Sequence, residues 1–188
     1  MVEIKGSVVG DSVKIIKSRY GEKAYETVLG LLKPETRAVF DTGSLVPMNW
    51  YSLDAFVEFL EMDLKVTSKG DEQELIKRSE ALIEQQLSTI YKVFIKLGSP
   101  DFVLSRIATI NQTYFRGVGV EISFPCPGSA VVKLTGFSKQ QRLIGLSIIG
   151  FYRKALDVSG AKDIKAAYTT SIEEDKGYCE LALSWSGK

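Results

Sequence analysis

The chain contains no histidine among its 188 residues. Hydrolases of the Ser-His-Asp and Cys-His types need a histidine base, and many zinc, iron and haem sites use histidine as a ligand. Its absence excludes those catalytic units and any histidine-ligated metal or haem. Cysteine is also scarce. With Cys126 and Cys179 alone, the chain cannot complete a four-thiolate metal site or form a disulfide framework. We therefore expect no metal, no cofactor and no enzymatic activity.

Neither sign of charge is in excess, since 24 Lys and Arg residues stand against 23 Asp and Glu residues, for a net charge of +1. Such a balance provides no bulk field to attract nucleic acid or an anionic membrane. The longest strongly apolar run, residues 143–152, is too short to cross a bilayer core of about 30 Å as a helix. The first residues lack the apolar region of a signal peptide. We expect a cytoplasmic protein with no membrane span and no nucleic-acid partner.

Two kinds of hydrophobic periodicity divide the sequence. Apolar residues recur at three- and four-residue steps in the first part, which predicts helices at residues 11–18, 22–32, 34–40, 52–66, 72–97 and 100–115. Apolar and polar residues then alternate, which predicts strands at residues 118–124, 130–134, 164–168 and 179–185, with a helix at 139–159 between the two pairs. The fold class is therefore α+β, a single domain over residues 1–188. A helical half (1–116) packs on a four-stranded, mainly antiparallel sheet with a crossing helix (117–188).

Polar residues on apolar helical faces are the main hint of a binding site. Ser79 and Gln86 interrupt the apolar face of the predicted helix at 72–97, where they either bond to a neighbouring helix or line a cavity. Positions near the junction of the two halves give the candidate ligand-binding residues Tyr91, Phe94, Ile110, Tyr114, Arg116 and Cys179, with Arg116 for any acidic headgroup. Core packing of Tyr114 and Cys179, and helix capping by Arg116, are the structural alternatives.

Four short motifs occur in an order that resembles a known family. They are residues 6–9 (GSVV), 50–53 (WYSL), 151–156 (FYRKAL) and 179–185 (CELALSW). Together they resemble an uncharacterised bacterial family found mainly in myxobacteria and their relatives, for which no activity is established.

The overall layout is similar, more distantly, to the haem-nitric-oxide-binding domain and the 4-vinyl reductase domain. Both place helices before a sheet with a crossing helix, and both are usually sensory ligand-binding modules. The first family needs a histidine on the helix before the sheet, and the comparable residues 102–111 contain none. The second often carries a C-terminal cysteine cluster that can hold zinc, and here only Cys179 is present in that region. The resemblance thus implies an apolar pocket between helices and sheet, without a metal.

Three functional hypotheses follow from these observations. The leading one is a non-enzymatic sensory or adaptor domain that binds a small apolar or lipid-like ligand between helices and sheet and signals to a protein partner. The alternative is a ligand-free interaction module that forms a homodimer or a signalling complex. The third is a cysteine-based redox switch, which needs a reactive, exposed thiol.

Overall fold

The computed structural model describes residues 2–41, 45–86 and 98–187. It confirms the α+β class, with helices first and a four-stranded antiparallel sheet second. The helical part consists of α1 (Gly6–Tyr20), α2 (Glu22–Leu31), α3 (Pro34–Asp41), α4 (Leu53–Thr67), α5 (Gln73–Gln86) and α7 (Pro100–Tyr114). Residues 87–97, the second part of the helix predicted at 72–97, lie outside the described residues.

The larger sheet has the strand order β4-β5-β7-β6, and every neighbouring pair is antiparallel. Its strands are β4 (Gly119–Ser123), β5 (Ser129–Thr135), β6 (Lys162–Thr170) and β7 (Tyr178–Ser186). Between the two strand pairs lies α8 (Arg142–Ser159), preceded by the short helix η1 (Lys139–Gln141), and η2 (Ile172–Glu174) precedes β7. Every second residue of β5 is buried, as the sequence alternation predicts for a sheet with one face on the core.

Local signals explain where several helices begin and end. The Ser52 hydroxyl accepts a hydrogen bond from the backbone N–H of Ala55 and so caps α4. Ser99 caps α7 in the same way, and Pro100 occupies the first turn, where a missing N–H costs nothing. Gly160 ends α8 in a left-handed conformation with φ of 97°.

A second, three-stranded sheet was not expected from the sequence. It has the order β2-β1-β3 and consists of β1 (Glu3–Lys5), β2 (Trp50–Ser52) and β3 (Phe115–Arg116). Both pairings of the central strand are antiparallel. Helix α1 also begins at Gly6 rather than at residue 11, because it follows directly on β1.

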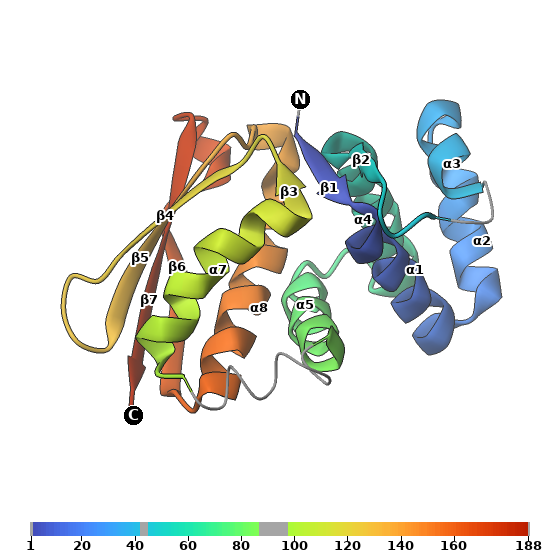
Figure 1. The fold of residues 1–188 in the computed structure, drawn as a ribbon. Coiled ribbons are helices and arrows are strands. Elements are labelled where there is room, and N and C mark those ends of the chain that lie inside the picture. The colour runs from blue at the N-terminus through green and yellow to red at the C-terminus, as the bar shows by residue number, and fades with distance from the viewer. Residues whose placement is uncertain (1, 42–44, 87–97, 188) are drawn as a thin grey trace.

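The elements form two packed groups with α5 between them (Figure 1). Helices α7 and α8 cover one face of the larger sheet, and α1 to α4 lie on the far side of α5 (Figure 1). Helix α8 is buried along much of its length, including Leu143, Ile144 and Leu156. In the part of the chain that the structure describes, no helix is long and apolar enough to cross a membrane.

Candidate ligand-binding cavity

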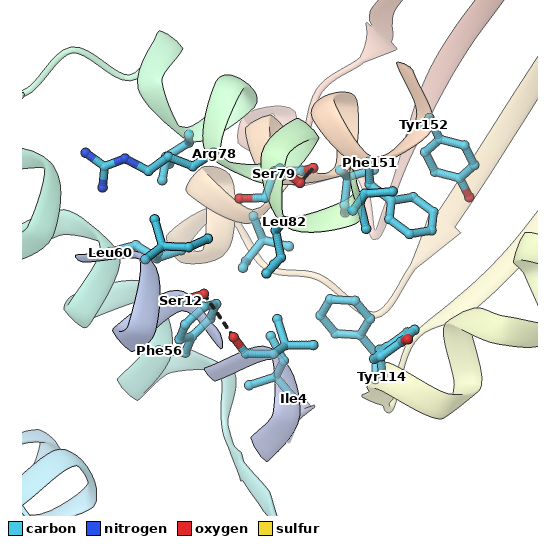
Figure 2. Close-up of a pocket in the computed structure, with 18 of the residues that line it drawn as sticks. Ile4, Ser12, Phe56, Leu60, Arg78, Ser79, Leu82, Tyr114, Phe151 and Tyr152 are labelled. Atoms are coloured by element: carbon cyan, nitrogen blue, oxygen red, sulfur yellow. Dashed lines mark hydrogen bonds between the residues drawn. The ribbon is translucent and has the colours of Figure 1, made fainter. Parts of the chain in front are cut away.

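A cavity of about 130 Å³ lies between the N-terminal helices and the sheet. Its lining comes from α1, α4 and α5 on one side and from α7, α8 and β5 on the other, with β1 and β3 at the junction. Figure 2 shows Ile4, Phe56, Leu60 and Leu82 around the space, with Phe151 and Tyr114 opposite Leu60. Most of the lining is aliphatic or aromatic, so the cavity offers an environment suited to apolar molecules.

Two serines in the lining donate their hydroxyl hydrogens to backbone carbonyls. Ser12 donates to the carbonyl oxygen of Val8 at 2.9 Å, the bond drawn in Figure 2. Ser79, on α5, donates to the carbonyl oxygen of Ser147, on α8, at 2.6 Å. The polar break that Ser79 makes in its helix face therefore serves both options foreseen from the sequence, a bond to a neighbouring helix and a place in a cavity wall.

A buried ion pair stands at one side of the cavity. The guanidinium of Arg78, on α5, is bonded to the carboxylate of Asp63, on α4. Arg78 also donates to the hydroxyls of Thr67 at 2.7 Å and Tyr20 at 3.3 Å. Burial raises the pKa of the Asp63 carboxyl above its ordinary value, against the opposing effects of the Arg78 charge and of the hydrogen bonds from Thr67 and Arg78. The pair fixes α5 against α4.

Two buried donors have no hydrogen-bond partner among the described residues: Nε of Arg78 and Nδ2 of Asn111. Both residues belong to the cavity lining. A buried donor without an acceptor costs roughly 1–3 kcal/mol, and such groups in native proteins call for a functional or structural reason. The Arg78 guanidinium has other partners, whereas the Asn111 amide nitrogen has none among the described residues.

The sequence-predicted residues are distributed unevenly around this cavity. Tyr114 lines it, at the end of α7. Ile110, Arg116 and Cys179 lie outside the described lining, and Tyr91 and Phe94 lie outside the described residues.

Arg116 and Cys179 have other surroundings. The Arg116 guanidinium stacks over the ring of Trp50, 4.2 Å from its centroid, and lies 3.6 Å from the carboxylate of Glu3. Cys179 is only 1% exposed, in β7 opposite Leu134 of β5. Burial raises the pKa of its thiol to about 11. A thiol that stays protonated at neutral pH is a poor nucleophile, which weighs against a redox switch at this residue.

Asp63, Arg78 and Asn111 were not foreseen as site residues. Asp63 lies among apolar residues on one face of α4, and that polar break is the signal that could have indicated it. For Asn111 a comparable signal is weak, because α7 carries several polar residues. Within the described parts of the chain, no three His, Cys, Asp or Glu side chains gather closely enough to hold a metal ion.

Comparison with known proteins gives a match at the level of structure. No family model and no curated protein matches the sequence. The unliganded Fe(II) H-NOX protein from K. algicida matches with a TM-score of 0.72 and 10% identity, over 98% of each chain. An H-NOX protein from S. oneidensis in the Fe(II)NO state matches with a TM-score of 0.73 and 13% identity, over 98% of this chain and 100% of that one. The chain has the fold of the H-NOX proteins.

A point mutant of the H-NOX protein from T. tengcongensis extends the comparison, with a TM-score of 0.62, 12% identity and coverage of 98% of both chains. Identities this low establish the shared H-NOX fold, and function has to be argued from the site itself. Another matching structure was determined to probe heme distortion in the H-NOX family, so the fit of this cavity to haem has to be tested.

The described residues of this chain do not fit a haem. Iron in haem is held by His, Cys, Met or Tyr, and of these only Tyr114 and Tyr152 occur in the described lining. Burial raises the pKa of the Tyr152 phenol well above its ordinary value, which disfavours the phenolate that would bind iron. The cavity volume of about 130 Å³ is close to that of a cavity of ~150 Å³ that holds one benzene molecule, so a macrocycle of four pyrrole rings is far too large.

Proposed function

We propose that the chain is a non-enzymatic sensory domain that binds a small, mostly apolar molecule in the cavity between helices and sheet. Binding is passed to a protein partner as a change in how the N-terminal helices sit against α5 and α8. The observation that carries the proposal is the cavity itself, a space with mostly apolar walls at the junction of the two groups of elements. The H-NOX fold, seen in proteins crystallised in defined ligation states, supports it by analogy.

The position of α5 supports a role in transmission. It lines the cavity along most of its length, through Leu75, Arg78, Ser79, Leu82 and Ile83. Its partners lie on both sides of the cavity. Arg78 bonds to Asp63 of α4, and Ser79 bonds to the Ser147 carbonyl of α8. A ligand that presses on α5 would therefore act on both groups of elements at once.

Exposed apolar side chains give less support to the ligand-free interaction module. Large apolar residues that are exposed in the described parts come from several segments: Tyr20 on α1, Leu31 on α2, Val46 and Met48 just before β2, Phe102 on α7 and Phe124 after β4. Single exposed apolar residues are ordinary on a protein surface, and a docking face needs a contiguous patch. The same experiment that tests ligand binding also tests this alternative.

Thermal unfolding with a one-ring probe tests the proposal. At ten times its Kd, α-methylstyrene should stabilise the protein by about 1.4 kcal/mol, which for a chain of this size is a rise in Tm of roughly 3–6 °C. Ser12→Leu fills part of the cavity and should abolish the rise.

The matched control is Ser105→Leu, at an exposed serine of α7 whose hydroxyl likewise bonds to the carbonyl four residues earlier. It should keep the full rise in Tm. A protein whose Tm does not respond to α-methylstyrene, and which native mass spectrometry shows as a ligand-free dimer, would refute ligand sensing in favour of the interaction module.

A further inference from the structure

We infer that the cavity selects a neutral molecule of about one ring with a single hydrogen-bond acceptor, which accepts from Nδ2 of Asn111, and that it rejects acids. This inference rests on the proposed function and makes its ligand class specific. It differs from the expectation drawn from the sequence, in which Arg116 received an acidic headgroup, because Arg116 lies outside the described lining and faces Trp50 and Glu3.

Size sets the first limit on the ligand. A volume of about 130 Å³ compares with the ~150 Å³ of an apolar cavity that holds benzene. A ligand of one aromatic ring with a short substituent fills such a space. A long-chain fatty acid or a fused polycyclic molecule exceeds it.

Charge sets the second limit. The charged residues in the described lining are Asp63 and Arg78, and they are bonded to each other. Figure 2 shows the Arg78 guanidinium directed away from Phe151 and Tyr114. The hydroxyls of Thr67 and Tyr20 accept further hydrogen bonds from it. A carboxylate inside the cavity would meet no unpaired cation in the described lining, and burying an unpaired charge is strongly unfavourable. A neutral ligand avoids that penalty.

Hydrogen bonding sets the third limit. The hydroxyl donors of Ser12 and Ser79 are already used on backbone carbonyls. The Asn111 amide nitrogen is buried in the lining and has no acceptor among the described residues. A ligand oxygen would give this nitrogen an acceptor for one of its two N–H groups, and a ligand without an acceptor would leave it unpaired. Sites built around such a donor discriminate strongly against analogues that lack the matching group.

Three probes of nearly equal shape separate these limits: acetophenone has a carbonyl acceptor, α-methylstyrene has a methylene in its place, and benzoate carries a charge. At pH 7, calorimetric titration should give acetophenone a Kd about tenfold lower than that of α-methylstyrene, with benzoate the weakest. In Asn111→Leu the two neutral probes should bind equally. Gln112→Leu, at the exposed neighbouring position on α7, is the control and should keep the tenfold preference.

The outcomes distinguish this inference from the proposed function. Equal binding of the two neutral probes to the unmodified protein, or tightest binding of benzoate, would overturn the inference and leave ligand sensing in place. Failure of all three probes to bind would overturn the proposed function. The preference in the unmodified protein decides the matter even if Asn111→Leu does not fold.

Discussion

The guanidinium of Arg78 and the carboxylate of Asp63 meet inside the protein, where the two residues are 6% and 2% exposed. They join α5 to α4 at the side of the cavity, with Thr67 bonded to both members of the pair. A buried pair of this kind is costly to break, because removing one partner leaves the other charge unpaired and out of water.

Asp63→Ala should therefore lower the free energy of unfolding by about 3–5 kcal/mol. The double variant Asp63→Leu with Arg78→Met, which removes both charges and keeps the volume apolar, should recover most of that loss. Urea unfolding of the single and double variants measures both values. A double variant as unstable as Asp63→Ala would show that the charges themselves stabilise the fold.

Gly150→Ala should destabilise the protein by about 1–3 kcal/mol through overpacking. A Cβ at Gly150 would run into the carbonyl oxygen of Ile76 on α5 and lie 2.9 Å from the Cβ of Ser79. Gly10→Ala is the matched control, because α1 leaves open space there and alanine is up to about 1 kcal/mol better than glycine within a helix. Thermal unfolding should thus move in opposite directions for the two variants, and a stabilised Gly150→Ala would contradict the close approach of α5 and α8.

Stability should fall between about pH 9 and pH 11 because of Cys179. Burial raises the pKa of its thiol from 9.0 to about 11, so above pH 9 the unfolded chain releases this proton while the folded protein retains it. The contribution is complete below pH 9 and is lost as pH rises toward 11, with a slope of up to ~1.4 kcal/mol per pH unit. Cys179→Ala should lack this component in urea unfolding at pH 8 to 11. Parallel pH profiles for the two proteins would contradict the raised pKa.

The two thiols should differ widely in reactivity. Cys126 is exposed, with its sulfur 3.1 Å from the hydroxyl of Ser129, and Cys179 is buried. An aromatic disulfide reagent at pH 8 should modify Cys126 about a hundredfold faster, because Cys179 reacts only after local opening. Mass spectrometry of the time course identifies the labelled residue. Rapid double labelling would revive the redox-switch hypothesis.

The purified protein mixed with haem should develop no Soret band of a specific complex. The cavity is too small for the macrocycle, and its lining lacks histidine, cysteine and methionine in the described parts. Absorbance titration at equimolar haem checks this. A band that disappears in the cavity-filling variant Ser12→Leu would show that haem enters this space after all.

Regular elements could be predicted because their signals are local. Alternation in β5 and β7 reflects a sheet with one face on the core, and the Ser52 cap and Pro100 mark helix starts by local effects. The small sheet could not be predicted, because its strands span two or three residues and depend on partners far away in the chain. The early start of α1 follows from that sheet, since no side chain caps its first turn.

The site was harder to predict for the same reason. Pairing of β1 with β3 sets Glu3 opposite Arg116, which brings the guanidinium to a surface carboxylate and to the Trp50 ring. The amide nitrogen of Asn111 becomes notable only when tertiary packing leaves it without an acceptor among the described residues. Composition excludes histidine-based chemistry from the start, and Ser79, for which the sequence left open a helix–helix bond or a place in a cavity wall, has both.

The small sheet also constrains how the cavity can move. Strand β1 runs directly into α1, β2 runs into α4, and β3 follows directly on α7, so three helices that line the cavity are pinned at one end to a common hub. Sliding any of them lengthwise would break backbone hydrogen bonds of the hub. Moving the opposite ends of these helices apart would leave the backbone hydrogen bonds of the small sheet intact. The small sheet is thus a shared joint for α1, α4 and α7, and tilting about it is the motion that would move their part of the cavity wall.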